Sequence, residues 1–325
     1  MDVQKEKEWL HRINGAQTSK KSDQEVRKTS SAKTETAVPM NKKAYSFKDV
    51  AGMDELKKLV LEGFINVLKN RECAEAFGIV PPSLLFYGPA GCGKTYFAEA
   101  IANEIGANFI KVVPDDIASK WVHGTQEKIG EIFRKAERNS PTVLFFDEFD
   151  AMVPKRTDGD VHNQNGEVNE FLCMLNNASE RGVYVIAATN RPDSIDNAVL
   201  RTGRIDEMIY VDMPDKAARE SLFRLSLSKL PSSEDIDYGR LADLTQGYNC
   251  SDISYIVKMA SRKMFNVNIE EHNHPYKVIT QDQIEDVISK RSPSVSPKEL
   301  RDLERIRSQF SPKDAGTRMP QIGFH

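Results

Sequence analysis

The chain has 325 residues, a length that suits about two domains and excludes a small scaffold held together by disulfides. It carries 45 Lys and Arg against 48 Asp and Glu, and the formal charge of −3 provides no overall field that would attract nucleic acid or an anionic membrane. The longest apolar stretches are strand-sized, so no membrane span is expected, and the first residues are too polar for a signal peptide. The 4 Cys are far apart without a CxxC pair, which favours a cytoplasmic protein whose thiols are free and buried.

Residues 1–44 are predicted to form a flexible tether. Between His11 and Ala44 the sequence is rich in Ser, Thr, Lys, Gln and Glu and has no aromatic side chain, so it cannot bury enough surface to offset its ordering entropy. At the start of the tether, Val3–Ile13 has the pattern of one or two amphipathic turns that carry Trp9. These turns are either a docking peptide for an adaptor protein or a frayed terminus.

Strands that alternate with amphipathic helices are predicted for residues 45–213. Short apolar runs indicate strands at Leu84–Tyr87, Phe109–Val113, Val143–Asp147, Val183–Thr189 and Met208–Val211. Apolar residues at helical spacing indicate helices over Thr95–Ile105 and after Thr125. The alternation predicts an α/β fold in which a parallel sheet is sandwiched by helices.

A small all-α lid domain is predicted for residues 214–310, because the apolar runs typical of strands stop where it begins. Its last helix has a start signal, with Ser296 as N-cap and Glu299 at the third position of a capping box. The apolar stripe of this helix extends to Phe310. The final residues, 311–325, have the composition of a loose tail.

A glycine-rich motif of the form G-x4-G-K-[ST] stands between the first predicted strand and the next helix, which is the context of a P-loop NTPase fold. Its residues are Gly88, Pro89, Ala90, Gly91, Cys92, Gly93, Lys94 and Thr95. The glycines let backbone N–H groups surround phosphates, and the helix N-terminus adds its dipole. We expect Lys94 to reach the β and γ phosphates of ATP and Thr95 to supply a hydroxyl to Mg²⁺. Cys92 is either a redox brake or a small filler side chain.

Carboxylate and amide side chains stand at the C-terminal ends of two further predicted strands, at the edge of a parallel sheet where ligands gather. Asp147 is expected to hold hydrated Mg²⁺, and Glu148 to orient and deprotonate the attacking water. Asn190 follows the next strand, where its neutral amide can bridge that water and the γ phosphate. Arg201 and Arg204 have the planar fork that stabilises charge on a transferring phosphoryl group, unless they form a surface salt-bridge pair.

These motifs together resemble the AAA family of ATPases. The resemblance rests on FKDVAG at Phe47–Gly52, the P-loop, FFDEFD, AATNRPD, LRTGRID and GYNCSDI at Gly247–Ile253, and it extends to Phe310. It implies an Mg-ATP hydrolase whose site is completed between the subunits of a ring, usually a homo-hexamer, with Arg201 and Arg204 as arginine fingers for the neighbour's ATP. Implied nucleotide contacts are Asp49, Ala51, Cys250 and Ser251.

Two positions near the implied nucleotide depart from the family pattern. Cys250 replaces a small residue, often Gly, that lies near the adenine, and Ser226 stands where many relatives carry a His close to the ribose. Because of these two differences, we expect an altered nucleotide affinity. The C-terminal helix is similar to that of the clade that contains katanin, spastin and the endosomal-sorting disassembly ATPase.

By the same resemblance, Lys120, Trp121 and Val122 form the loop that lines a central pore and grips an extended polypeptide. An aromatic ring suits this role because it contacts many sequences without hydrogen-bond readout. The alternative is that Trp121 packs into the core. One residue is inserted after this motif and the family's acidic position is lost. The polar stretch Thr157–Gly166 resembles the second pore loop.

Three functional hypotheses follow. The leading one is an AAA ATPase that forms a hexameric ring with ATP and remodels, unfolds or disassembles protein substrates in the pore, with an adaptor bound by the N-terminal segment. The alternative is a nucleotide-gated scaffold that does not translocate anything. A DNA-acting P-loop ATPase is disfavoured by the pI of about 6.1 and the lack of a basic stripe. His272 and His274 lack further ligands at metal-site spacing and are better explained as a polar loop.

Overall fold

The computed structural model describes residues 47–118, 124–155, 164–201, 203–272 and 275–310. The predictions for the tether 1–44, for Lys120, Trp121 and Val122, and for the tail 311–325 lie outside these residues. His274 also lies outside them.

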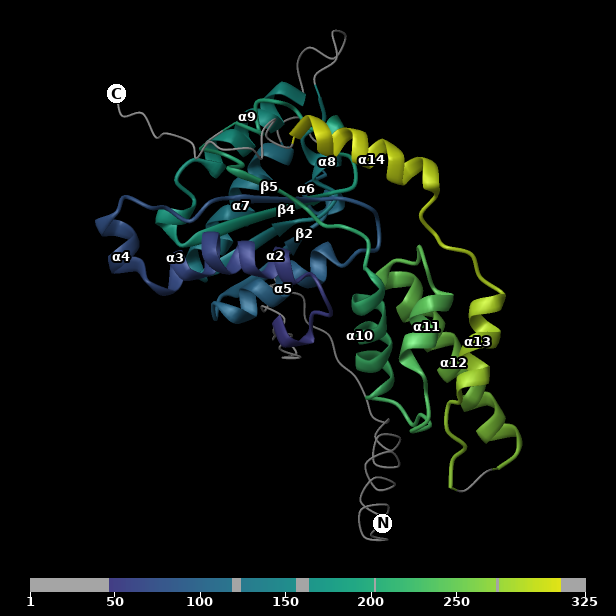
Figure 1. Cartoon of the computed structure of the whole chain (residues 1–325). Coiled ribbons are helices and arrows are strands. Elements are labelled where there is room, and N and C mark those ends of the chain that lie inside the picture. Colours follow the sequence, from purple (N-terminus) through teal and green to yellow (C-terminus); the bar gives the residue numbers. More distant parts are fainter. Residues whose placement is uncertain (1–46, 119–123, 156–163, 202, 273–274, 311–325) are drawn as a thin grey trace, which may run out of the picture. The chain divides into compact units, whose positions relative to one another are not determined.

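Within the described residues, one sheet contains five parallel strands in the order β2-β3-β4-β1-β5 (Figure 1). The strands are β1 (Leu84–Tyr87), β2 (Asn108–Val112), β3 (Thr142–Phe146), β4 (Val183–Thr189) and β5 (Glu207–Tyr210). All five strand predictions are confirmed to within one residue. The predicted α/β fold is also confirmed. Because every pair is parallel, the residues that follow β1, β3 and β4 emerge at the same edge of the sheet.

Helices cover both faces of the sheet. Because successive strand residues point to opposite faces, neighbouring residues of one strand pack against different helices. On one face, Phe86 and Phe145 pack with helices α2 (Asp54–Val60) and α5 (Lys94–Glu104). On the other face, the neighbouring residue Phe146 packs with α7 (Gly124–Arg138), α8 (Phe149–Met152) and α9 (Gln164–Leu175). The shorter elements are η1 (Phe47–Asp49), η2 (Leu61–Ile65), α3 (Asn66–Lys69), α4 (Arg71–Ala76), α6 (Pro114–Ile117), η3 (Ser179–Arg181) and η4 (Pro192–Ser194).

A third hydrophobic core lies among the helices that follow the sheet. These helices are α10 (Lys216–Leu227), α11 (Tyr238–Leu244), α12 (Cys250–Glu270) and α13 (Gln281–Ser289). Phe223 of α10, Leu241 of α11, Ile256 of α12 and Ile284 of α13 are fully buried members of this core. The predicted helical character of this region is therefore confirmed, and its core is separate from the two cores of the sheet.

The last helix, α14 (Pro297–Phe310), contacts the sheet. Ser296 Oγ accepts a hydrogen bond from the backbone N–H of Glu299 at 3.2 Å, as the predicted cap requires. At the other end, the rings of Phe310 and Tyr87 lie 6.2 Å apart between centroids, and the guanidinium of Arg307 lies 4.5 Å from the centre of the Tyr210 ring. These contacts place the end of α14 beside β1 and β5, and β5 is an edge strand of the sheet.

Two sequence-based expectations are wrong in part. Cys73 and Cys173 are exposed, so only Cys92 is a fully buried thiol and Cys250 is half-buried. Exposure follows from their places on the outer sides of α4 and α9, which local sequence does not reveal. Of the polar stretch Thr157–Gly166, residues 157–163 lie outside the described residues, and the last three residues belong to α9, which begins at Gln164.

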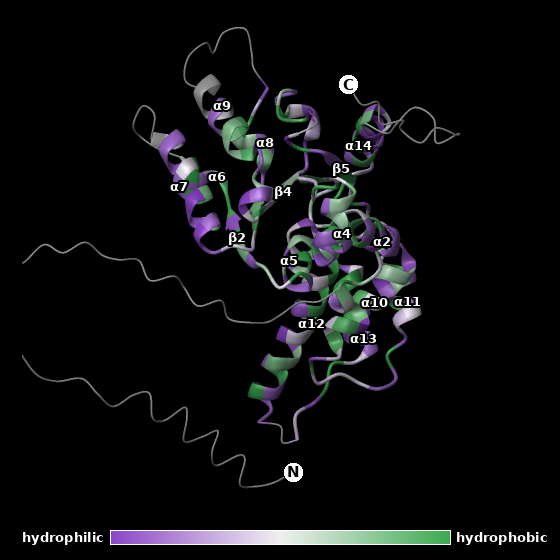
Figure 2. Cartoon of the chain, turned by 90° about the vertical axis from the view of Figure 1, so that its left-hand side faces the viewer, coloured by the Kyte–Doolittle hydropathy of each residue, from purple (hydrophilic) through white to green (hydrophobic). Residues whose placement is uncertain are grey.

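An apolar groove lies at the end of α12. Figure 2 shows hydrophobic residues gathered there, where Phe265, Ile269 and Tyr276 line a groove of about 290 Å³ and are more than half exposed. Among the described residues, no helix is both long and apolar enough to cross a membrane.

Candidate functional site

The loop Gly88–Lys94 has the backbone conformation of a phosphate cradle. Gly88, Gly91 and Gly93 have φ angles of 145°, 72° and 89°, which favour glycine over all other residues. A Cβ on Gly88 would lie 2.2 Å from the carbonyl oxygen of Val211, so glycine is also required by the close approach of this backbone segment, which follows β5. Helix α5 begins immediately after this loop, and its N-terminus points its free N–H groups into the cradle.

The ammonium of Lys94 lies at the centre of this loop. Its Nζ donates to the carbonyl oxygens of Gly88 at 2.9 Å and Pro89 at 2.8 Å, and to Oδ1 of Asn190 at 2.6 Å. Burial lowers the pKa of Lys94 to about 8, because the charged form loses hydration, although the Asp147 carboxylate opposes this effect. A phosphate group fits here, since it would supply the negative charge that the buried ammonium lacks.

Asp147, which the sequence predicts to be a magnesium ligand, lies beside Thr95. The hydroxyl of Thr95 donates to Asp147 Oδ2 at 3.2 Å, so the two predicted metal ligands are adjacent. Lys111 Nζ lies 2.7 Å from the same oxygen, a contact that the sequence analysis did not anticipate. The described residues contain no group of three His, Cys, Asp or Glu side chains that could hold a metal. One carboxylate and one hydroxyl suit Mg²⁺, which keeps most of its ligands as water and phosphate oxygens.

Glu148 and Asn190 lie at the ends of neighbouring strands. Glu148 is exposed and has a φ of 52°, a left-handed conformation that is uncommon for a residue with a side chain. Backbone strain of this kind is typical of functional positions. Asn190 is also exposed and is held by its bond to Lys94. Asn190 therefore stands beside the phosphate cradle, Glu148 directly follows the Asp147 that accepts from Thr95, and both residues are open to water.

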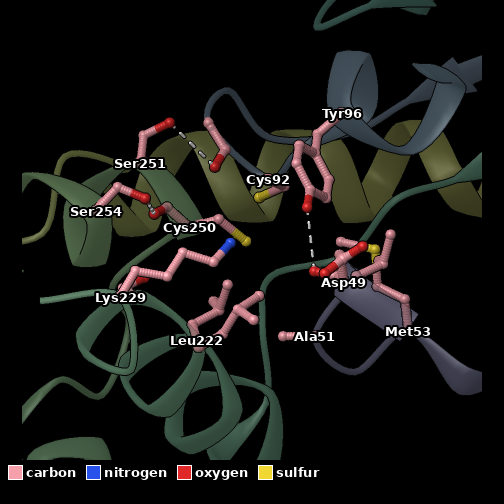
Figure 3. A pocket seen from close by; sticks show the side chains of 15 residues that line it. Asp49, Ala51, Met53, Cys92, Tyr96, Leu222, Lys229, Cys250, Ser251 and Ser254 are labelled. Carbon is pink, nitrogen blue, oxygen red and sulfur yellow. Dashed lines mark hydrogen bonds between the residues drawn. The ribbon is translucent and has the colours of Figure 1, made fainter. Parts of the chain in front are cut away.

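A pocket of about 510 Å³ adjoins the cradle, and this volume suits a nucleotide (Figure 3). It is lined by Asp49, Val50, Ala51, Met53, Gly91, Cys92, Gly93, Tyr96, Leu222, Leu225, Ser226, Lys229, Cys250, Ser251 and Ser254. In Figure 3, Lys229 and Cys250 stand on one side of the pocket and Asp49 and Tyr96 on the other. The Tyr96 hydroxyl donates to the carbonyl oxygen of Asp49 at 3.2 Å, which fixes that wall. The four nucleotide contacts expected from the resemblance, Asp49, Ala51, Cys250 and Ser251, thus lie around one cavity.

Comparison with known proteins agrees with this geometry. Residues 84–213 match the ATPase family associated with various cellular activities (AAA). The chain is 37% identical over 275 residues to the cell division cycle protein 48 homolog of Archaeoglobus fulgidus, an alignment that covers 81% of this chain and 38% of that relative. The chain belongs to the AAA family. Its α/β region is an AAA ATPase domain, and it spans well under half the length of the relative that it matches.

The two arginines of this AAA domain have different surroundings. Arg204 is half-buried, and its Nη1 donates to the carbonyl oxygen of Ala198 at 2.5 Å. Arg201 is exposed, and no hydrogen bond or ion pair engages its guanidinium within the part of the chain that the structure describes. The salt-bridge pair that the sequence analysis left open is not formed among these residues. Arg201 is therefore available to a ligand or to another subunit.

The cysteines of the AAA pocket are poor nucleophiles. Burial raises the pKa of the Cys92 thiol to about 12 and that of Cys250 to about 11, so both remain protonated near neutral pH. Cys92 Sγ lies 3.5 Å from the sulfur of Met213. These surroundings favour the interpretation of Cys92 as a filler side chain over that of a redox brake.

Several pocket residues were missed by the sequence analysis. Leu222, Leu225 and Lys229 project from one face of α10 and the turn that follows it, and their spacing of three and four residues could have marked a shared face. Nothing in the sequence indicated that this face would meet the P-loop. The lining role of Tyr96 was equally hidden, although Tyr96 directly follows the P-loop.

Proposed function

We propose that this AAA ATPase couples hydrolysis of Mg-ATP to the remodelling, unfolding or disassembly of protein substrates, and that it does so as a ring. The observation that carries the proposal is the convergence of Lys94, Asn190, Thr95, Asp147 and Glu148 at one edge of the sheet. It is the arrangement that phosphoryl transfer needs, with charge neutralisation, a metal position and a base beside each other.

The residues divide the chemical work between them. The P-loop N–H groups and Lys94 hold the phosphates of the substrate, and the ammonium exchanges its three protein acceptors for phosphate oxygens. Glu148, which is open to solvent, takes the proton from the attacking water, and the Asn190 amide orients that water. Thr95 and Asp147 would hold Mg²⁺, which would supply neutralisation of the phosphate charge. Lys111 would have to release Asp147 Oδ2, or share it.

A ring assembly is supported by the exposure of Arg201. An exposed arginine with no bonded partner among the described residues can reach the γ phosphate of a neighbouring subunit, where an arginine accelerates phosphoryl transfer. Arg204 contributes as the partly buried member of the pair. We propose a homo-hexamer in the ATP-bound state.

Other parts of the proposal have not been tested, and the pore loop and the N-terminal segment lie outside the described ranges. The grip of Lys120, Trp121 and Val122 on a protein substrate, an adaptor bound by residues 1–44, the cytoplasmic location and the division into domains at residues 45–213 and 214–310 remain predictions. The substitution Trp121→Ala distinguishes a translocase from a scaffold. In a translocase it abolishes substrate processing but not ATP turnover, whereas in a scaffold it has no effect. Stimulation of hydrolysis by DNA, with a steep salt dependence, would favour the DNA-acting alternative.

A complementation experiment tests the shared site. Glu148→Gln retains ATP and loses hydrolysis, and Arg201→Ala also loses hydrolysis. When the two inactive variants are mixed, rings contain some sites with an intact Glu148 from one subunit and an intact Arg201 from its neighbour. We expect ATPase activity to reappear in the mixture, and light scattering of Glu148→Gln to show a shift from monomer to hexamer with Mg-ATP.

Two results would contradict this proposal. Normal hydrolysis by Glu148→Gln would remove the assignment of the base. A mixture that stays inactive, with each variant monomeric in Mg-ATP, would show that Arg201 does not act between subunits and would favour the scaffold.

A further inference from the structure

Asn249 lies where three separate parts of the chain meet. It is the residue before α12, it is 2% exposed, and its neighbours include the P-loop and the segment that leads to α14. A buried amide has one acceptor and two donor positions to satisfy, so its partners reveal what it fixes.

Each group of the Asn249 amide has a partner. Oδ1 accepts a hydrogen bond from the backbone N–H of Asp252 at 2.8 Å and caps α12. Nδ2 donates to the carbonyl oxygen of Ala90 and to Ser294 Oγ, both at 2.9 Å. The orientation of the amide follows from chemistry, because a backbone carbonyl such as that of Ala90 can only accept.

The P-loop fits closely around this amide. A Cβ on Gly91 would lie 2.5 Å from Asn249 Nδ2, so the contact is possible only because this P-loop position is glycine. The second residue of α12 adds to this contact, since the backbone N–H of Ser251 donates to the carbonyl oxygen of Gly91 at 3.1 Å. Figure 3 shows the second contact from Ser251, in which its Oγ reaches the same carbonyl. The start of α12 thus binds the two P-loop carbonyls at residues 90 and 91.

Further contacts hold Ser294 and Asp252, the two residues that bond to the Asn249 side chain. Ser294 donates to Asp252 Oδ2 through its N–H at 3.0 Å and its Oγ at 2.9 Å. Arg291 pairs with Asp252 Oδ1 at 2.6 Å. Although burial alone would raise the pKa of Asp252, the bonds from Arg291 and Ser294 lower it below its usual value, so this anchor stays charged near neutral pH.

We propose that Asn249 is a positioning residue that holds the P-loop in its phosphate-binding conformation and makes nucleotide affinity depend on the placement of α12. The inference rests on the proposed function only in requiring that the P-loop binds Mg-ATP. Asn249 does not line the pocket, so it acts through Ala90 and Gly91. A loop that is held in its bound conformation loses less freedom when the ligand binds.

The test separates this role from helix capping. Asn249→Ser keeps a good N-cap for α12 but is too short to donate to Ala90. The matched control is Asp237→Ala, which removes the cap of α11, where Oδ1 accepts from the N–H of Arg240 at 2.9 Å, without touching the P-loop. For both variants we would measure the Kd for ADP and ATP by calorimetry, the melting temperature, and kcat and KM.

We expect Asn249→Ser to weaken ADP and ATP binding equally, by about fivefold, as for the loss of one neutral hydrogen bond. KM rises by the same factor while kcat stays within about twofold, and the melting temperature changes little. Asp237→Ala lowers the melting temperature and leaves both Kd values unchanged. If Asn249→Ser does not fold, Asn249→Asp keeps the cap and the shape but replaces the donor by an oxygen that faces Ala90, and the same affinity loss or a larger one is expected.

Unchanged or tighter nucleotide binding by the folded variant would overturn the role of Asn249. An equal loss of affinity in Asp237→Ala would also overturn the proposal, because the effect would then come from the general stability of the helices. Failure of the wild-type chain to bind Mg-ATP at all would instead overturn the proposed function, so the two failures are distinguishable.

Discussion

The nucleotide site has two sides that are built in different ways. The phosphate side consists of Gly88–Thr95, Asp147, Glu148 and Asn190, and its residues come from a loop and from the ends of buried strands. The lid side consists of residues 49–53 with the lining residues of α10 and α12, and it is formed by packing between segments far apart in the chain. The phosphate side thus depends on charge and local backbone shape, whereas the lid side depends on how helices are placed.

The largest effect that we predict concerns the fit of the lid side. Gly52 has a φ of 63°, and a Cβ there would lie 2.5 Å from Ala218 Cβ in α10. Gly52→Ala should therefore lower the free energy of unfolding by about 2–4 kcal/mol, of which about 1–2 kcal/mol comes from the left-handed backbone and the rest from overpacking. Urea unfolding measures this loss.

Gly78→Ala is a matched control for that substitution. Gly78 has a φ of 64° but nothing lies within 4 Å of its Cβ position, so only the backbone cost of about 1–2 kcal/mol is expected. Equal losses in the two variants would mean that the contact between Gly52 and α10 contributes nothing to stability.

A pH dependence of about tenfold per unit is expected on the phosphate side. The pKa of Lys94 is about 8 without nucleotide, and phosphate oxygens near the ammonium would raise it. Binding therefore has its full strength below pH 8 and weakens as the pH rises from 8 towards the pKa of the complex, by about 1.4 kcal/mol per unit. Titration calorimetry with ADP between pH 6.5 and 9.5, at about one-unit steps, would reveal the slope. A flat profile over this range would contradict the buried, charged Lys94.

The smallest expected effect concerns Lys229 on the lid side. Its side chain points into the pocket towards Cys250 (Figure 3), and within the described residues its ammonium has no hydrogen-bond or ion-pair partner. We expect Lys229→Ala to weaken ATP and ADP binding about fivefold, roughly 1 kcal/mol, with kcat unchanged. Lys216→Ala serves as the control, because Lys216 also lies on α10 but pairs with Asp243 on the surface. Identical Kd values for both variants would exclude a contact between Lys229 and the nucleotide.

The phosphate side could be predicted almost completely from the sequence. Gly88–Thr95 is contiguous, and Asp147 and Asn190 follow apolar runs whose strands were located to within one residue. Parallel strands bring their carboxyl ends to one edge, so these residues had to lie near each other. What escaped prediction was Lys111, whose contact with Asp147 depends on β2 lying beside β3.

The lid side was predicted only where the resemblance named a residue. Ser226, Cys250 and Ser251 were placed near the nucleotide by resemblance, but no sequence pattern indicated that Lys229 lines the pocket or that Asn249 reaches Ala90. The exposure of Cys73 and Cys173 was also missed. The contact between Asn249 and Ala90 joins residues 159 positions apart and leaves no periodic pattern.

The strands, the main helical regions, the P-loop and the resemblance to the AAA family could be predicted from the sequence, because each is encoded in contiguous residues or in short-range periodicity. The contact of Asn249 with the P-loop, the exposure of Arg201 beside the bonded Arg204 and the return of α14 to the sheet at Tyr87 became visible only in the folded molecule. These features depend on packing between segments far apart in the chain, which no local sequence pattern specifies.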